Sequence, residues 1–249
     1  MIIEKIQWHR AVQGELISSK EVHVWRLLFN EHYSHVENIK KLLSTDELER
    51  AGKFHFEKDQ NKFIMARGVL RMILAGYLGL KPHELRFEYT SFGKPFLSEN
   101  NGSDIISFSL SHSDDMALYA VTINQSVGVD VERIKESVDI AQIANRFFST
   151  GEIQSLECIH EKERPGKFFQ YWTRKEALVK AIGKGISFPL EQVDVSLING
   201  KTLSPIKLPG TIKENSCWHV QDLYPGNGYA AAIATEGSDL NISYWDYQC

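Results

Sequence analysis

Two long helical patterns, each followed by short strand-like segments, constrain the fold of this chain more than any other feature. The first pattern covers about residues 57–78, where Phe63, Leu70 and Leu74 fall near one face of the expected helix. The second covers residues 167–182 and is strongly amphipathic. Glycines follow both patterns, and a glycine is a common helix terminator. The chain therefore has two rigid helices against which strands can pack.

The segments between these helices show the alternation that is typical of strands. We expect strands over residues 21–28, 85–89, 105–110, 117–123, 127–134, 193–197, 218–223 and 229–235. Capping-box pairs, Ser44 with Glu47 and Ser149 with Glu152, predict two further helix starts. The order of elements indicates an α+β fold of two similar lobes, residues 1–125 and 126–249, related by pseudo-twofold symmetry. The alternative to an internal duplication is that any α+β chain shows a helix followed by strands. A duplicated fold would place the active site in the cleft between the lobes.

Composition excludes several classes of protein. The 249 residues carry a formal net charge of −4, so the whole chain has no general attraction to nucleic acid or to an anionic membrane. Three widely spaced cysteines, Cys158, Cys217 and Cys249, form neither a zinc motif nor a disulfide framework. No apolar run approaches the roughly 20 residues of a membrane span, and the first residues do not read as a secretory signal. We expect a cytoplasmic protein without nucleic-acid or membrane partners.

The segment Gly-Val-Asp-Val-Glu, residues 128–132, is the first candidate site. Residues two apart on a strand share a face, so Asp130 and Glu132 project together while the valines point into a core. Two adjacent carboxylates repel unless a cation compensates, and a hard cation that prefers oxygen ligands does so. A strand with one solvated face explains the same pattern, so both interpretations stay open here.

The second long helix is the next candidate. Glu176 and Lys180 are spaced i,i+4 and lie on one face, where they could hold a cation and a phosphate together. An ordinary surface ion pair is the simpler alternative. Aromatic flanks and the following Gly-Lys-Gly, residues 183–185, favour a ligand site, although a glycine helix cap also explains the glycines.

Other polar residues are weaker candidates. Lys94 lies in a Gly-Lys-Pro turn, and Ser111 and His112 end an expected strand, so all three could contact phosphate. The first helix carries Lys62 and Arg67, which could reach a terminal phosphate or simply face solvent. A Ser/His hydrolase is conceivable, but no GxSxG elbow is present, and no phosphate-binding P-loop or dinucleotide fingerprint occurs.

In order along the chain, these motifs resemble those of the Sfp-type 4′-phosphopantetheinyl transferases. The motifs that carry the resemblance are FGKPFL (92–97), FSLSHS (108–113), GVDVERI (128–134), RFFSTGE (146–152) and FFQYWTRKEALVKAIGKGIS (168–187). Each motif alone is weak, but the ordered series is specific and covers most of the chain after Lys53. Val131 departs from the isoleucine that is commoner there, and the N-terminal lysines used for the adenosine 3′-phosphate do not align cleanly.

The resemblance implies a fold and an activity. It implies two α+β lobes in one monomeric chain and transfer of the phosphopantetheine arm of coenzyme A to a serine of an apo acyl or peptidyl carrier protein. It also implies Mg²⁺, with Mn²⁺ as a substitute, bound by Asp130, Glu132 and Glu176. Phosphate and nucleotide contacts would come from Lys62, Arg67, Lys94, Pro95, Ser111, His112, Lys175 and Lys180.

Two catalytic roles follow from the same resemblance. Lys180 would assist departure of adenosine 3′,5′-bisphosphate, and Glu152 matches a glutamate proposed as a base, although it also completes a capping box. The serine proton could instead go to Glu176 or to a metal-bound water. Two alternative functions remain at this point: a non-catalytic nucleotide- or carrier-binding module, and a metal-dependent phosphohydrolase with the same carboxylates.

Overall fold

The computed structural model describes residues 7–10, 17–98, 105–185, 188–196, 206, 217–237 and 241–248. It confirms the α+β class. The helices are α1 (Phe29–His32), α2 (Val36–Lys40), α3 (Thr45–Ala51), α4 (Glu57–Leu78), α5 (Ile140–Phe147), α6 (Thr150–Glu157) and α7 (Arg164–Ile182). The strands are β1 (His9–Arg10), β2 (Glu21–Leu28), β3 (Phe87–Tyr89), β4 (Pro95–Leu97), β5 (Ile106–Ser113), β6 (Met116–Ile123), β7 (Val127–Arg133), β8 (Trp218–Leu223), β9 (Tyr229–Glu236) and β10 (Asn241–Asp246).

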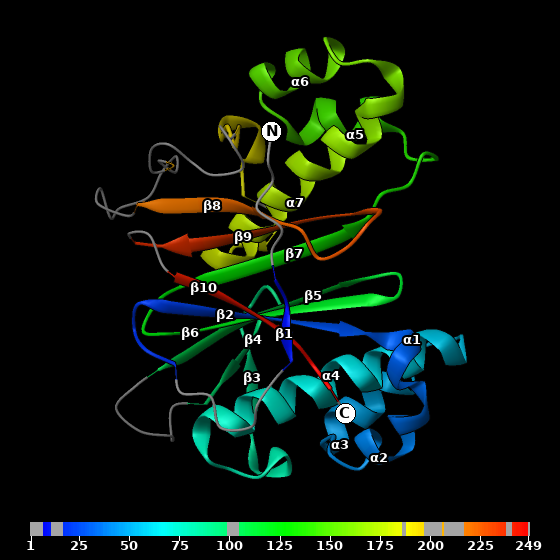
Figure 1. Ribbon diagram of the computed structural model, residues 1–249, viewed down its shortest axis with the longest axis vertical. Coiled ribbons are helices and arrows are strands. Elements are labelled where there is room, and N and C mark those ends of the chain that lie inside the picture. The colour runs from blue at the N-terminus through cyan, green and yellow to red at the C-terminus, as the bar shows by residue number, and fades with distance from the viewer. Residues whose placement is uncertain are drawn as a thin grey trace.

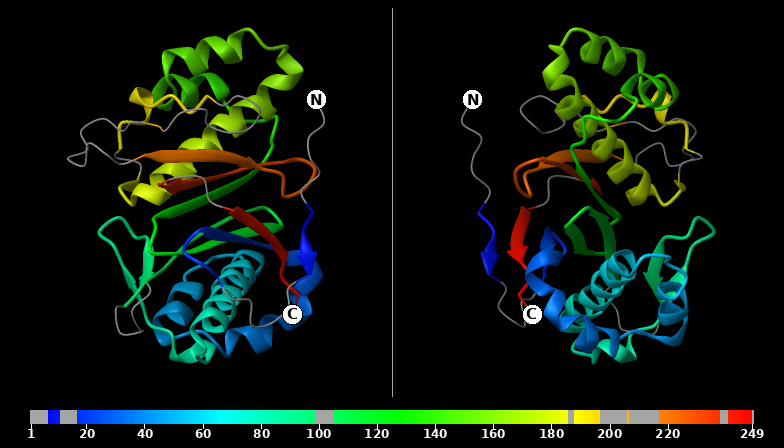
Figure 2. Two further views of the ribbon diagram at one scale, coloured as in Figure 1. Left: turned by 60° about the vertical axis from the view of Figure 1, so that its left-hand side comes forward. Right: turned by 90° about the vertical axis from the view of Figure 1, so that its right-hand side faces the viewer.

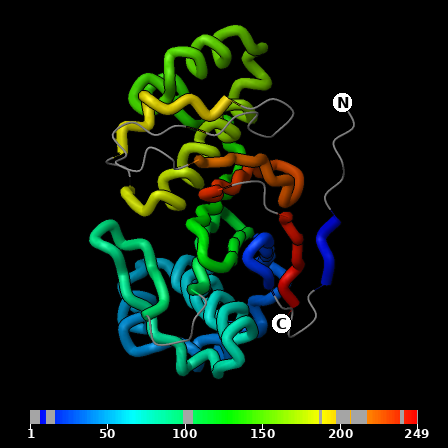
Figure 3. The backbone as a smooth tube through the Cα atoms, turned by 90° about the vertical axis from the view of Figure 1, so that its left-hand side faces the viewer, coloured from blue at the N-terminus to red at the C-terminus, as the bar shows by residue number. Residues whose placement is uncertain are grey.

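The elements form four layers, a group of helices, two sheets and a second group of helices (Figure 1). One sheet has the order β1-β10-β2-β6-β5, and the other has the order β7-β9-β8. Strands β3 and β4 form a separate hairpin beside them. The side views show α1–α4 beyond the larger sheet and α5–α7 beyond the smaller one (Figures 2 and 3). The two sheets therefore share the centre of the molecule.

The alternation of apolar residues along the strands explains this layering. On β2, Trp25 and Leu27 face the core that includes α4, whereas Val22 and Val24 face the other sheet. Strand β7 supplies the opposing valines at 127, 129 and 131 to the core between the sheets. The alanines of β9 at 230, 232 and 234 pack toward α7. Strands β2 and β9 thus bury apolar residues on both faces.

The last strand crosses back to the sheet formed mainly by the first half of the chain. β10 pairs in parallel with β2, with Trp245 opposite Trp25. The boundary expected between residues 125 and 126 falls at the turn from β6 to β7, while β10 lies beyond that boundary in sequence. The first 125 residues therefore share their sheet with a strand from the end of the chain.

The main difference from the expected elements lies around residues 193–197. Residues 193–196 form no strand, although Val193 and Val195 are fully buried; residue 197 lies outside the described part. Side chains take up the backbone groups here, because the Val195 amide donates to Glu152 and the Val193 carbonyl accepts from Lys175. No described helix is both long and apolar enough to cross a membrane.

Candidate functional site

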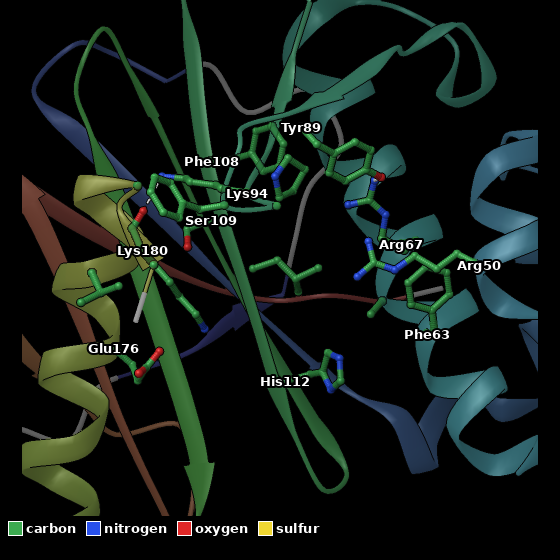
Figure 4. Close-up of a pocket in the computed structure, with 18 of the residues that line it drawn as sticks. Arg50, Phe63, Arg67, Tyr89, Lys94, Phe108, Ser109, His112, Glu176 and Lys180 are labelled. Atoms are coloured by element: carbon green, nitrogen blue, oxygen red, sulfur yellow. Dashed lines mark hydrogen bonds between the residues drawn. The ribbon is translucent and has the colours of Figure 1, made fainter. Parts of the chain in front are cut away.

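A cavity of about 380 Å³ opens between α4, the β3–β4 hairpin, β5 and α7. Its lining differs from one side to the other (Figure 4). Glu176 and Lys180 project from α7 on one side, and Arg67 and Phe63 project from α4 on the other, with His112 of β5 between them. The further lining residues include Arg50, Phe54, Tyr89, Phe92, Lys94 and Pro95.

Strand β7 presents the two carboxylates predicted from its sequence. Asp130 is 3% exposed, and its Oδ1 accepts hydrogen bonds from the Ser111 hydroxyl and the Lys180 ammonium, both at 2.7 Å. Its Oδ2 is buried and has no hydrogen-bond partner among the described residues. Glu132 Oε2 accepts a hydrogen bond from Ser113 at 2.7 Å. The alternative of a solvated strand face does not apply to Asp130.

Gly128 allows α7 to reach these carboxylates. A Cβ atom at this position would lie 2.0 Å from the carbonyl oxygen of Ala177 and 2.4 Å from the amide nitrogen of Ala181. Only a glycine therefore permits the helix backbone to lie directly on β7. This close approach brings Glu176 and Lys180 beside Asp130, so the pair is not an ordinary surface ion pair.

Burial and neighbouring charge shift the titration of the acidic groups. Burial raises the pKa of Glu176, and the negative charges of Asp130 and Glu132 raise it further, against an opposing effect of Lys180. Burial also raises the pKa of Glu132. The Oε1 atom of Glu176 is buried and lacks a partner among the described residues. These carboxylates repel one another and would be stabilised by an added cation.

The basic groups in the pocket are shifted in the other direction. Burial lowers the pKa of Lys94 to about 8, and the charge of Lys180 contributes. The Lys94 ammonium donates to two backbone carbonyls, those of Val127 and Lys180. Burial lowers the pKa of His112, with the charges of Lys180 and Lys62 adding to the effect. Lys94 thus ties the hairpin to α7 and β7.

The opposite wall combines cations with aromatic rings. Arg67 is held by Glu47 at 2.8 Å and by the hydroxyl of Tyr89, and its guanidinium lies 4.6 Å from the ring centroid of Phe87. Arg50 stands nearby, over the ring of Phe63. Such a wall can bind an anionic group and a planar ring together.

Six of the expected site residues are not part of the cavity lining: Lys62, Ser111, Asp130, Glu132, Glu152 and Lys175. Lys175 and Glu152 are both fully buried and form an ion pair of 2.9 Å away from the cavity lining. The Lys175 ammonium also donates to the carbonyls of Leu190 and Val193. Lys175 precedes Glu176 in the helix and therefore projects about 100° away from it. Lys62 is paired with Asp115 at 3.4 Å, near His112 but outside the cavity lining.

Sequence reasoning missed Arg50 and most of the aromatic wall. The sequence signal that could have revealed this wall is the pair Phe54 and Phe56, because the residues around them are charged or polar, unlike those of a core segment. Both side chains are substantially exposed, at 41% and 65%. Exposed aromatic residues beside a basic helix would have suggested a ring-binding surface.

Comparison with known proteins identifies the family. A model of the 4′-phosphopantetheinyl transferase superfamily matches residues 126–234, and a model of the 4′-phosphopantetheinyl transferase N-terminal region matches residues 29–124. The 4′-phosphopantetheinyl transferase HetI of Nostoc sp. is 35% identical over 92% of this chain and 93% of that protein. The chain belongs to the 4′-phosphopantetheinyl transferase family.

More distant members of the 4′-phosphopantetheinyl transferase family match as well. The 4′-phosphopantetheinyl transferase Sfp of Bacillus subtilis is 26% identical over 82% of this chain and 87% of its own length. An L-aminoadipate-semialdehyde dehydrogenase-phosphopantetheinyl transferase of Xenopus laevis is 27% identical over 78% of this chain and 68% of its own length. The resemblance found in the sequence motifs is thereby confirmed.

The carboxylates of this family member fit a hard cation by their chemistry. Among the described residues, no three histidine, cysteine or carboxylate side chains stand close enough to enclose a metal ion. However, Asp130 Oδ2 and Glu176 Oε1 are both buried and without partners in the described part of the chain. Unpaired buried carboxylate oxygens are costly unless something compensates them, and Mg²⁺ prefers oxygen ligands. The donor set therefore suits Mg²⁺.

Proposed function

We propose that this chain transfers the 4′-phosphopantetheine group of coenzyme A to a serine of an apo carrier protein in a Mg²⁺-dependent reaction. One observation supports this proposal above all others. Glu176, which has a buried oxygen without a partner among the described residues, lines a cavity whose opposite wall carries arginines and aromatic rings, and Asp130, with a second such oxygen, adjoins this wall through its hydrogen bond with Lys180. Coenzyme A has two parts that match these walls: a diphosphate, which binds a metal ion, and an adenosine with a further phosphate, which suits arginines and aromatic rings.

In the proposed reaction, the carrier serine oxygen forms a bond to the phosphorus that bears pantetheine. The bond from that phosphorus to the adenosine 3′,5′-bisphosphate oxygen breaks, and the leaving group takes the electron pair. The serine proton passes to a base; Glu176 lines the cavity, and the carboxylate oxygen that does not hold the cation would accept this proton. Bound Mg²⁺ would offset charge on the diphosphate.

The protein side chains have separable roles in this proposal. Asp130, Glu132 and Glu176 would hold Mg²⁺. Lys180, whose ammonium lies 2.7 Å from Asp130, would stabilise negative charge on the diphosphate and on the leaving group. Arg50, Arg67 and His112 line the cavity farther along and would bind the adenosine end.

The proposal also includes two similar lobes with the active site between them. In support, each long helix packs on one face of its own sheet, α4 on the larger and α7 on the smaller. The cavity draws residues from both α4 and α7, so one chain supplies both walls and a monomer suffices. Exposed free thiols at Cys158 and Cys217 suit a reducing compartment, and we propose the cytoplasm.

The test is a mass measurement on the carrier. Incubation of this protein with coenzyme A, Mg²⁺ and a panel of apo carrier domains should increase the mass of at least one carrier by one phosphopantetheinyl group. A carrier whose target serine is replaced by alanine should gain nothing, and chelation of the metal should stop the reaction. Binding of coenzyme A without transfer would support a binding module, and cleavage of coenzyme A without a carrier would support a phosphohydrolase.

A further inference from the structure

Strands β5 and β7 lie side by side at the edges of the two sheets, and the described residues form no backbone ladder between them. Serine hydroxyls make the connection instead. Ser109, Ser111 and Ser113 are two apart on β5 and therefore project from the same face toward β7. We call these three residues the serine row. The amides of Val129 and Arg133 donate to its first and last members, each at 3.1 Å.

The hydrogen-bond pattern fixes where the hydroxyl proton of Ser113 lies. The Arg133 amide can only donate, so the Ser113 oxygen accepts there. Its single proton is left for Glu132 Oε2, at 2.7 Å. Ser111 likewise donates to Asp130 Oδ1 at 2.7 Å. Distances this short are typical of hydrogen bonds to an ionised acceptor.

Each of these two hydroxyls therefore holds one carboxylate. For Asp130, the bonds from Ser111 and Lys180 both fall on Oδ1, whereas the buried Oδ2 has no partner among the described residues. The hydroxyl fixes the side-chain rotamer and leaves the other oxygen available. Ser109 differs from both, because it bonds only to a backbone amide of β7 among the contacts described for its hydroxyl.

We propose that Ser113, together with Ser111, is a positioning residue that holds the β7 carboxylates in the orientation needed to bind the divalent cation. This inference rests on the proposed function. Outer hydrogen bonds of this kind orient metal ligands and tune their affinity. It also gives Ser111 a role other than the expected phosphate contact, since its proton is committed to Asp130.

The test compares Ser113→Ala with Ser109→Ala. In Ser113→Ala, the Mg²⁺ concentration for half-maximal transfer should rise about 10-fold, with the KM for coenzyme A changed much less. Mn²⁺ affinity in the presence of coenzyme A, measured by electron paramagnetic resonance without a carrier, should fall by the same factor. Ser113→Thr keeps the hydroxyl and should restore both values.

Ser109→Ala is the matched control, because it removes a β5–β7 hydrogen bond that involves no carboxylate. It should lower the melting temperature but leave the half-saturating Mg²⁺ concentration and the Mn²⁺ affinity unchanged. If Ser113→Ala does not fold, the test uses Ser113→Cys instead, because a thiol is similar in size to the hydroxyl but a much weaker hydrogen-bond donor.

The outcomes separate this inference from the proposed function. Equal metal affinities in Ser113→Ala and the unchanged protein would overturn the positioning role even if transfer occurs. Loss of metal affinity in Ser109→Ala to the same extent would also overturn it, because the serine row would then act only through the fold. Failure of the unchanged protein to transfer any group would overturn the proposed function, while a Mn²⁺ affinity specific to Ser113 would still support this inference.

Discussion

At the scale of single residues, the site depends on buried carboxylates whose negative charge is only partly neutralised by neighbouring ammonium groups. Asp130 and Glu176 each present a buried oxygen without a partner in the described structure. The ammonium of Lys180 partly neutralises the charge of Asp130. It also lowers the pKa of Glu176, but burial and the neighbouring carboxylates raise that pKa by more. A cation near these oxygens is therefore attracted more strongly than it would be in water.

Glu176 and Lys180 should respond differently to added metal. Glu176→Gln removes a charged oxygen donor and should lower turnover at least about 100-fold, or about 2.7 kcal/mol, with partial recovery at raised Mg²⁺ or Mn²⁺. Lys180→Met should lower the rate constant more than coenzyme A affinity, without recovery. Initial rates across a metal titration distinguish the two. Two small losses would return the pair to the role of a surface ion pair.

Lys94 should make stability depend on pH. Its folded-state pKa of about 8 lies below the ordinary lysine value of 10.5. Between these two values the unfolded chain binds more protons, so the free energy of unfolding contributed by this group rises with pH, by at most about 1.4 kcal/mol per pH unit. Below about pH 8 the contribution is constant.

The measurement is urea unfolding from pH 7 to 10 for the unchanged protein and for Lys94→Met. The difference in stability between the two proteins should grow in favour of the unchanged protein above about pH 8. A difference that stays flat across this range, or that shrinks, would contradict the assigned shift.

At the scale of elements, the contact of α7 with β7 creates the site. Gly128→Ala places a methyl group 2.0 Å from the Ala177 carbonyl oxygen, so helix and strand must separate. We expect a loss of at least about 2 kcal/mol in unfolding free energy, together with loss of activity. Gly76→Ala is the control, since nothing lies within 4 Å of its added Cβ in α4; it should gain about 0.5–1 kcal/mol. Equal stabilities of the two variants would refute the close contact.

The buried pair of Glu152 and Lys175 should behave as a structural unit. Both side chains are fully buried, and Glu152 also accepts hydrogen bonds from the amides of Ser149 and Val195. Removing one charge leaves the other buried without a partner, so Glu152→Gln and Lys175→Met should each lower the unfolding free energy by about 3–5 kcal/mol. A double-mutant cycle in urea should show a combined loss well below the sum. Additive losses would mean that the two charges act independently.

Local sequence signals predicted most of these elements. The bounds expected for β2 and α4 agree with the structure, and both capping boxes form. The parallel pairing of β10 with β2 could not be predicted, because strand pairing between distant segments leaves no local periodicity. The missing strand at residues 193–196 has the opposite cause, since apolar alternation there reflects burial against side chains instead of a ladder.

At the scale of the whole molecule, the site exists only when distant parts of the chain come together. The strand period on β7 predicted that Asp130 and Glu132 share a face, and the helix period on α7 predicted the same for Glu176 and Lys180, because both periods are local properties. Only the family resemblance placed the two pairs together. Arg50 is on α3, more than 110 residues before the start of α7 at Arg164, and no local pattern joins the two. The family resemblance also implied a diphosphate contact for Lys175, which is wrong here because the side chain is fully buried and paired with Glu152.

The most direct test of this account is the rate at which Asp130→Asn transfers phosphopantetheine to a carrier. Asparagine keeps the shape of the side chain and can accept the Ser111 hydrogen bond, but it removes the charge beside Lys180. The account predicts that transfer falls at least about 100-fold at the Mg²⁺ concentration that saturates the unchanged protein, while the variant melts as a folded protein. A rate near that of the unchanged protein would contradict the assignment of this carboxylate, and with it the proposed site.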